Sequence, residues 1–331
     1  MHKIQEKSPC CHGSVWRRGE RRRQCSICGK TWRSWKKRKG RKRKRNNLNL
    51  VFRYLRNASG SIRQQAKRKQ ITPAALSAQM AQALKQFNKI TPWPTIPAGK
   101  LILVADAMIE YIDGIPHTFY FLLLRPIRQK KAVICPFSVR IKEGEGFYGW
   151  HAALQQLSPE VRKRICVLVC DGVQSLIRIG KDHGWLVQRC QFHLQARISH
   201  CCSPRRFGKR PRYARKMQKF VSIILKNRKQ KPIQKALNEI GKMKEQITSR
   251  AFKTVLSGFL KNHEDYRTYL YYPQYYIPTT SNSAEFLIGR IRDLQYRARG
   301  FKSLKSLSLW IEAYCKYTQI ITCNGKFSAP N

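Results

Sequence analysis

The sequence predicts an α/β protein with a mixed sheet flanked by helices. Between residues 100 and 190, short apolar segments rich in β-branched residues alternate with segments of helical pattern. From residue 194 to residue 275 the strand signal disappears, and the chain becomes basic and helical. The hydrophobic fraction of 42% is ordinary, so a chain of 331 residues can bury a substantial core despite its charge.

The elements of this sheet are expected in a definite order. Three strands come first, and a turn at Asp113-Gly114 joins the first two. A helix, a fourth strand, a second helix and a fifth strand follow. The strands are LILVADAM (101–108), HTFYFLLLRP (117–126), KAVICPFSV (131–139), ICVLVC (165–170) and WLVQRC (185–190); the helices are 146–157 and 173–182, with two more over 282–296 and 303–321.

Composition divides the chain into further segments. A cysteine-bearing segment (1–35) and a basic linker (36–46) precede three expected helices within 47–92. Two of these helices are short and joined by a tight turn, which suits either a helix-turn-helix for DNA or a plain three-helix packing module. The proline-rich TPWPTIPAG (91–99) predicts a domain boundary. The sheet domain then comprises 100–193 and 279–325, interrupted by a helical insertion at 194–278.

The N-terminal cysteines predict a zinc ribbon. Cys25-Ser26-Ile27-Cys28-Gly29 has the spacing of a zinc knuckle, in which a tight turn presents two thiolates to one ion. The first pair is irregular, because serine stands where the first cysteine of a knuckle is usual. The expected Zn²⁺ ligands are Cys10, Cys11, Cys25 and Cys28, with His2 or His12 as alternatives for the missing ligand. The other interpretation is a set of unpaired cysteines.

The charge predicts a nucleic-acid partner. With 67 Lys and Arg against 17 Asp and Glu, the net charge is +50, which attracts the chain to phosphate backbones. No apolar run approaches the roughly 20 residues of a membrane span, and no signal peptide is evident, so we expect a cytoplasmic protein. The basic run is a solvated linker or lies along DNA phosphates through Arg41, Lys42, Arg43, Lys44 and Arg45.

Two scarce acids predict a metal site. Asp106 and Asp171 each follow an apolar run, on the first and fourth expected strands. That order is the one a ribonuclease H-like fold would give, and it would bring the two strands side by side. Two neighbouring carboxylates repel each other, and a divalent cation such as Mg²⁺ removes that repulsion. Without any family pattern, these residues indicate a metal pair in a protein that binds nucleic acid.

Four features together resemble the DDE transposases of bacterial insertion sequences, in the Mutator-like group. They are the Asp106 strand, the Asp171-Gly172 turn, the tetrad Cys190-Gln191-Phe192-His193, and TTSNSAE ending at Glu285 before an Arg-rich helix. The resemblance covers roughly 100–325 and implies a catalytic triad of Asp106, Asp171 and Glu285. It also implies two Mg²⁺ ions, which Mn²⁺ can replace, and double-stranded DNA ends as substrate. A homodimer or larger assembly on DNA is expected.

The resemblance also gives supporting roles to Cys190, His193 and Asn282. Asn282 and Glu285 equally fit a helix capping box, which would need no further role. Four arginines of the last helices either contact DNA phosphates or form a solvated face: Arg290, Arg292, Arg297 and Arg299. Four other acids are not expected to be the third ligand. Glu110 and Asp113 lie at a turn, and Glu143 and Glu145 lie in a Gly-rich loop that comes too early in the chain.

Two other functions remain open at this point. One is a catalytically decayed or domesticated transposase that binds DNA through its basic N-terminal half. The other is a ribonuclease H-like nuclease that hydrolyses DNA without strand transfer.

Overall fold

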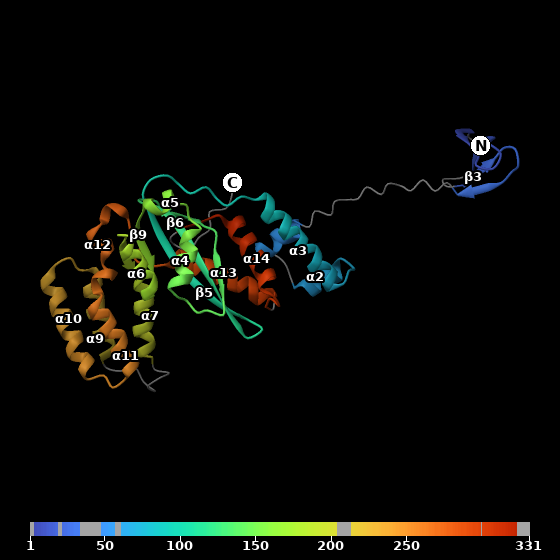
Figure 1. Cartoon of the computed structure of the whole chain (residues 1–331). Helices are drawn as coiled ribbons and strands as arrows, with labels where there is room; N and C mark the ends of the chain where they lie inside the picture. Colours follow the sequence, from blue (N-terminus) through green and yellow to red (C-terminus); the bar gives the residue numbers. More distant parts are fainter. Residues whose placement is uncertain are drawn as a thin grey trace. The chain divides into compact units, whose positions relative to one another are not determined.

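The structure is a computed structural model that describes residues 3–18, 22–33, 48–56, 61–203, 213–298 and 300–322. The chain divides into two compact units, residues 1–46 and residues 47–331 (Figure 1). The boundary between these units coincides with the end of the basic linker (36–46) that composition predicts. The run of Arg and Lys between 41 and 45, and Arg299, lie outside the described residues.

The N-terminal unit is a small antiparallel sheet in the order β1-β2-β3-β4. Two turns carry its cysteines, one between β1 and β2 and the other between β3 and β4. Gly29, in the second turn, has a φ of +69°, a conformation that glycine adopts without strain. The strands are β1 (Lys3–Lys7), β2 (Ser14–Arg18), β3 (Arg22–Cys25) and β4 (Thr31–Arg33).

The larger unit contains a mixed sheet with the strand order β10-β9-β5-β6-β7-β11, and β8 pairs with the outer part of β6. β5 runs antiparallel to β6 and parallel to β9, so the strands predicted as first (101–108) and fourth (165–170) are neighbours, as expected. The strands are β5 (Leu101–Ile112), β6 (Ile115–Pro126), β7 (Lys131–Ile134), β8 (Ser138–Ile141), β9 (Ile165–Cys170), β10 (Leu186–Arg189) and β11 (Ile320–Thr322).

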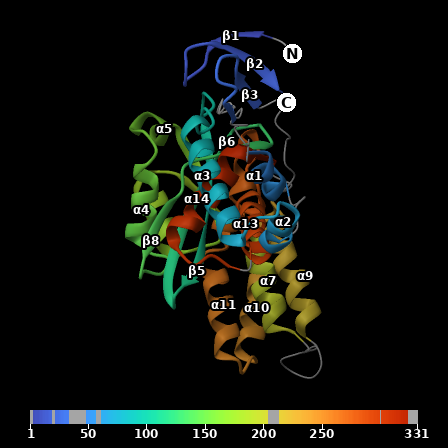
Figure 2. The same cartoon turned by 90° about the vertical axis from the view of Figure 1, so that its right-hand side faces the viewer.

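Helices cover both faces of this sheet. Alternate residues of β5 enter two separate cores: Ile102 and Val104 face one side, whereas Leu101 and Leu103 face the other. The first core is closed by α13 (Asn282–Ala298), α14 (Leu304–Thr318), α1 (Leu48–Leu55) and α3 (Pro73–Ile90), with α2 (Ile62–Arg68) beside α3 (Figure 2). The second is closed by α4 (Phe147–Gln155) and α6 (Gln174–Asp182), with α5 (Pro159–Arg164) next to β9.

The three N-terminal helices of this unit belong to the same compact body as the sheet. The side-chain amide of Asn88 on α3 donates to the carbonyl of Leu309 on α14, at 3.0 Å, and the Lys316 ammonium donates to the carbonyl of Asn88. The proline-rich connector therefore runs inside one unit instead of separating two. A helix-turn-helix role for α2 and α3 stays a prediction.

The helical insertion has a core of its own. Met217, Phe252 and Phe259 are among its buried residues. Its helices are α7 (Gln191–Cys201), α9 (Tyr213–Lys226), α10 (Gln230–Glu245) and α11 (Arg250–Lys261), followed by the short η1 (His263–Tyr266), α12 (Thr268–Tyr271) and η2 (Pro273–Tyr275). At its base, the backbone N–H of Gln191 donates to the carbonyl of Thr279, at 2.9 Å. This bond holds the two ends of the insertion together, between the end of β10 and the start of α13.

Several strands differ from the sequence prediction. β5 does not end at Asp106 but continues to Ile112, because it pairs with β6 along its whole length. The predicted strand 131–139 is two strands, β7 and β8, since Pro136 between them has no N–H for the ladder. The helix predicted over 303–321 ends at Thr318, and Ile320–Thr322 form β11 because they pair with β7. The sequence pattern does not predict the short helix α5.

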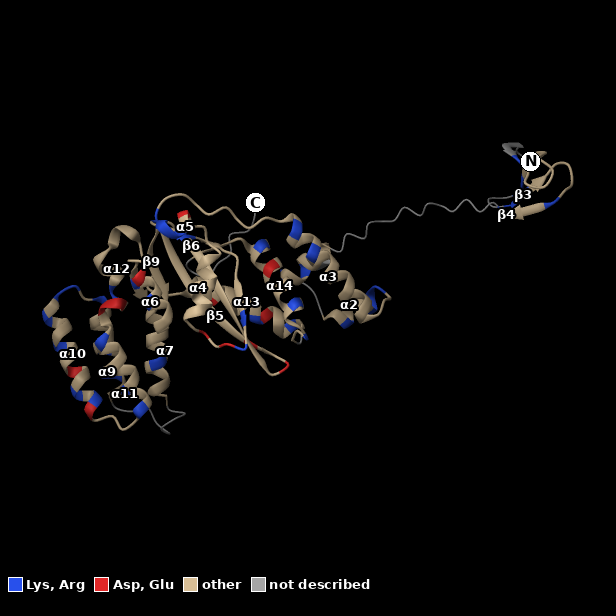
Figure 3. Cartoon of the chain, viewed as in Figure 1, with Lys and Arg blue, Asp and Glu red and all other residues tan. Residues whose placement is uncertain are grey.

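Charge is spread over the helices of the larger unit. Figure 3 shows Lys and Arg on the insertion helices α9, α10 and α11 and on α2, α3 and α14, with few acidic residues among them. Within the described parts of the chain, no helix combines the length and apolarity that a bilayer span requires.

Candidate functional site

Asp106 and Asp171 occupy equivalent positions on neighbouring parallel strands. The parallel pairing of β5 with β9 ends at Val104 opposite Val169. Each aspartate lies two residues beyond this last pair, so both side chains belong to the sheet face that α13 covers. The sheet therefore brings the two predicted carboxylates to the same edge, although Asp106 itself lies in mid-strand.

Backbone amides fix one oxygen of each carboxylate. The N–H of Ala107 donates to Asp106 Oδ1 at 2.9 Å, and the N–H of Val173 donates to Asp171 Oδ1 at 3.1 Å. Gly172 shapes the turn after Asp171, with a φ of +106°, and a Cβ there would lie 2.5 Å from the Arg189 guanidinium. The turn that presents Asp171 therefore requires glycine.

Asp106 is electrostatically strained in the absence of a cation. Burial, and then the charge of Asp171, raise the pKa of Asp106 from 3.8 to about 7, while the Ala107 amide and His193 oppose the shift. Glu285 raises the pKa further by a smaller amount. A carboxyl group with this pKa holds a proton through much of the neutral range, or accepts a cation in its place.

Glu285 reaches the same region from the first turn of α13. The hydroxyl of Ser281 donates to Glu285 Oε1 at 2.7 Å. The thiol of Cys190 lies 3.7 Å from the same oxygen, and His193 Nδ1 lies 3.5 Å from it. One carboxylate oxygen of Glu285 is thus surrounded by three polar side chains.

Cys190 and His193 lie at the start of α7, directly after β10. The N–H of Cys190 donates to the carbonyl of Cys170 at 2.7 Å, and the N–H of Ser281 donates to Cys190 Sγ at 3.4 Å. The side chain of Cys190, followed by the charges of Glu285 and Asp171, raises the pKa of His193 to about 9. His193 therefore carries a positive charge at neutral pH.

The helix cap is not Asn282, as one interpretation of the sequence predicts, but the residue before it. The carbonyl of Ser281 accepts from the N–H groups of Ala284 and Glu285, so the cap position is Ser281 and Asn282 is the first helical residue. The side chain of Asn282 is exposed, and it makes no hydrogen bond to the cluster among the described residues. Ser281 is the residue that contacts Glu285, and the sequence pattern does not single it out.

Glu145 also lies near the aspartates, which sequence spacing does not predict. Its burial and the charge of Asp171 raise the pKa of Glu145 to about 7. The indole N–H of Trp150 donates to Glu145 Oε1 at 3.0 Å. The available sequence signal is the glycine on either side of Glu145, in the loop before α4.

The described arginines of α13 differ in their surroundings. Arg297 donates to the carbonyl of Tyr54 on α1 at 3.0 Å, so it joins two helices. Arg290 lies 3.4 Å from Asp293 and its guanidinium stacks over Phe286. Arg292 is exposed. Burial raises the pKa of Glu110, and the positive charge of Arg292 opposes that rise. Arg292 is therefore the most accessible of the three.

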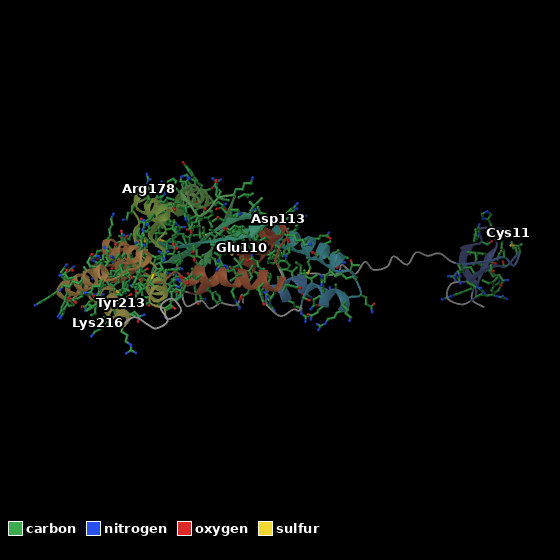
Figure 4. All side chains as sticks on the ribbon, turned by 90° about the horizontal axis from the view of Figure 1, so that it is seen from below. Cys11, Glu110, Asp113, Arg178, Tyr213 and Lys216 are labelled. Atoms are coloured by element: carbon green, nitrogen blue, oxygen red, sulfur yellow. The ribbon has the colours of Figure 1, made fainter. Side chains whose placement is uncertain are left out.

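Other acids lie on the hairpin that joins β5 to β6. Figure 4 labels Glu110 and Asp113 there, and it labels Tyr213 and Lys216 on the helical insertion. Asp113 has a φ of +51° and Gly114 one of +75°, which is a two-residue hairpin turn. The turn that the sequence predicts at this pair is present, and Asp113 belongs to it.

Two groups of side chains in the described chain have ligand atoms within 4.8 Å of one another. One is Cys10, Cys11, Cys25 and Cys28; the other is Cys190, His193 and Glu285. The carboxylates of Asp106, Asp171 and Glu285 do not form a third such group among the described residues.

The four N-terminal cysteines form a cluster that could hold a metal ion, and it matches the predicted zinc ligands. The sulfurs of Cys10 and Cys28 are 3.4 Å apart. Hydrogen bonds from Ser8 and from the backbone lower the pKa of Cys25 to about 6, whereas contacts with Cys28 raise the pKa of Cys11 to about 12. Four sulfurs from two turns are the donor set of a structural zinc site.

Neither a protein-family model nor a curated protein sequence matches this chain.

Proposed function

We propose that this protein is a metal-dependent DNA transposase with a ribonuclease H-like catalytic domain. The observation that carries the proposal is the pair Asp106 and Asp171, at equivalent ends of the β5–β9 pairing, with mutual repulsion that helps to raise the pKa of Asp106 to about 7. The strand order, with β5 between β6 and β9, supports the ribonuclease H-like assignment.

Two of the three proposed ligands are already arranged to suit a hard divalent cation. Asp106 and Asp171 each have a second oxygen that accepts no described hydrogen bond, and carboxylate oxygens are the ligands that Mg²⁺ prefers. Glu285 is the proposed third ligand. It would complete the set with Oε2 or after its Oε1 leaves the contacts with Ser281, Cys190 and His193. When bound, Mg²⁺ or Mn²⁺ would activate the attacking oxygen and stabilise the leaving one.

The proposed reaction is two successive in-line phosphoryl transfers. In the first, a water oxygen attacks phosphorus at the end of a mobile element, and a 3′ oxygen leaves. In the second, that 3′ hydroxyl attacks a target phosphorus, the P–O bond to the target's own 3′ oxygen breaks, and that oxygen leaves as the new 3′ hydroxyl. Neither step forms a covalent bond to the protein, so the tasks of the chain are to position DNA and stabilise charge.

The remaining parts of the chain are proposed to hold DNA. The N-terminal cluster would order the small sheet, and the basic residues 36–46 would follow phosphates. On α13, exposed Arg292 is better suited to a phosphate contact than Arg297, because Arg297 donates to α1. Since two ends must be joined, we propose that the chain acts as a dimer or larger assembly on DNA.

The test is cleavage of the DNA that flanks the gene, assayed with the full chain and Mg²⁺. Asp171→Asn should lower the cleavage rate by more than about 1,000-fold, because the metal pair loses one of its carboxylates. The matched control is Asp182→Asn, which changes an exposed acid on α6 that pairs with Arg178 at 3.9 Å and should leave the rate unchanged.

Three outcomes are informative. Cleavage followed by strand transfer, both lost in Asp171→Asn, supports the proposal. Cleavage with no strand-transfer product at any time would instead identify a nuclease. If wild type and variant are equally inert and bind DNA equally well, the protein is a DNA-binding protein and the enzymatic proposal fails.

A further inference from the structure

Cys190, His193 and Glu285 form a second compact group of metal-ligand side chains, distinct in chemistry from the aspartate pair. We propose that Cys190 Sγ, His193 Nδ1 and Glu285 Oε1 form a binding site for one Zn²⁺ ion. One sulfur, one imidazole nitrogen and one carboxylate oxygen are the three donor types that zinc takes in proteins, with a fourth position left for water.

The geometry of the group is set by the backbone. Cys190 is the cap residue of α7 and His193 is three positions further along, so both project from the same side of the helix start. Glu285 enters from the first turn of α13. Its Oε1 atom is 3.7 Å from Cys190 Sγ and 3.5 Å from His193 Nδ1, and small side-chain movements would bring all three to one ion. Binding would release the thiol proton of Cys190 and the Nδ1 proton of His193 to solvent, so the affinity should rise with pH.

One atom of the group is unsatisfied as it stands. His193 Nδ1 is buried and has no partner in hydrogen-bond geometry within the described chain. A buried polar atom without a partner costs free energy, and coordination would remove that cost. Both other ligands are already oriented, since the N–H of Ser281 donates to Cys190 Sγ and its hydroxyl donates to Glu285 Oε1. Such outer contacts are typical of metal sites.

The donor set discriminates between metals. Mg²⁺ requires oxygen ligands, whereas thiolate and imidazole favour Zn²⁺ and similar softer ions. The aspartates lie close by, because both Asp171 and Glu285 act on His193, so the surroundings favour a cation. A zinc ion here would be held without displacing a magnesium ion from Asp106 and Asp171.

The consequence for catalysis rests on the proposed function. With Glu285 Oε1 held on zinc, only Oε2 remains for a magnesium ion and the carboxylate cannot turn toward the aspartates, so Zn²⁺ would slow Mg²⁺-dependent cleavage by competing for this side chain. The binding site itself does not depend on that function, and its test is direct metal binding.

The experiment uses Co²⁺ as a spectroscopic substitute for Zn²⁺ in the full chain. The background carries Cys10→Ser and Cys28→Ser, which silence the N-terminal cluster. One equivalent of Co²⁺ should give the charge-transfer absorption of a single thiolate, and one equivalent of Zn²⁺ should abolish it. In this background, Cys190→Ser should remove the band, and His193→Ala should weaken binding more than about 100-fold. Ser281→Ala removes only an outer contact and should weaken binding about 10–100-fold.

The matched control is Cys166→Ser, which changes a half-buried cysteine on β9 whose thiol donates to the carbonyl of Leu101 and should leave the band intact. Circular dichroism identifies any variant that fails to fold, and the separate His193→Ala and Ser281→Ala variants keep the test decisive in that case. No single-thiolate band in the background protein, or a band that survives Cys190→Ser, would overturn the proposal. Asp171→Asn should keep the band, so loss of cleavage with cobalt binding retained tests the enzyme separately from the zinc site.

Discussion

At the scale of single residues, the raised pKa of Asp106 makes the stability of the protein depend on pH. Its pKa in the folded protein, about 7, lies above its ordinary value of 3.8, so the metal-free folded state binds more protons than the unfolded state between these values. The free energy of unfolding must therefore fall as pH rises through this window. Below about pH 4 the effect is absent, and above about pH 7 it is complete.

Asp106→Asn is accordingly expected to stabilise the metal-free protein at about pH 8, by on the order of 2 kcal/mol, and to have little effect near pH 4. Urea unfolding with a chelator present, at both pH values, measures this difference. Asp182→Asn, at an exposed position near the end of α6, should show no such pH dependence. The same unfolding free energy for wild type and Asp106→Asn at pH 8 would contradict the assigned burial and repulsion.

The residues of the site differ in how far sequence can identify them. Asp106 and Asp171 are identifiable because each follows an apolar strand and the strand order makes those strands neighbours. Ser281 and Glu145 cannot be identified from the sequence. A serine before a helix is common, and spacing along the chain does not show that a loop folds back to Asp171. Such contacts depend on tertiary packing alone.

At the scale of elements, the contact between α4 and β6 is so close that it requires glycine. A Cβ on Gly149 would lie 2.0 Å from the Tyr120 hydroxyl oxygen and 2.1 Å from its ring carbon Cζ. The Tyr120 ring also packs edge-on against Trp150, with ring centroids 4.8 Å apart. The helix can rest on the sheet at this distance only because residue 149 has no side chain.

Gly149→Ala should therefore lower the free energy of unfolding by about 1–3 kcal/mol, because α4 must move away from β6. Gly258→Ala is the matched control: this glycine lies inside α11, no neighbouring atom lies within 4 Å of the place an added methyl carbon would take, and the change should stabilise by about 0.5–1 kcal/mol. Urea midpoints measure both effects. Opposite signs are the expected pattern, and stabilisation by Gly149→Ala would refute the packing argument.

Element prediction succeeds where the local signal and the tertiary structure agree. The long strands and the insertion helices have clear periodicity, and the structure contains them. The strand predicted across Pro136 is wrong because its apolar pattern continues through a residue that cannot donate to a ladder. β11 has only three residues, and it is a strand because β7 supplies its partner.

At the scale of the whole molecule, the two units should respond differently to metal removal. The small N-terminal sheet has few buried apolar residues among those described, Val15 being one, so we expect its stability to depend on a metal ion held by its cysteine cluster. The larger unit has three hydrophobic cores, and we expect its stability not to depend on that cluster.

A strong chelator should therefore make residues 3–33 sensitive to protease, while a fragment that begins near residue 47 stays intact. Limited proteolysis followed by mass spectrometry measures this. Cys28→Ser should reproduce the effect without chelator, and Cys315→Ser on α14 should not. Equal resistance with and without chelator would show that the N-terminal unit holds its fold without metal.

The hydrogen bond between Gln191 and Thr279 has a consequence for how this fold can vary. Because this 2.9 Å bond holds the two ends of the insertion together, the length of the segment between them does not set the spacing of the strands. The part of the insertion nearest the sheet is fixed, since the Gln188 amide on β10 donates to the carbonyl of Tyr266 and the Thr268 hydroxyl donates to the carbonyl of Val187, so variation in length belongs to α9, α10 and α11. The sheet, and the carboxylates at the ends of its strands, would stay in place while these insertion helices change in length or sequence.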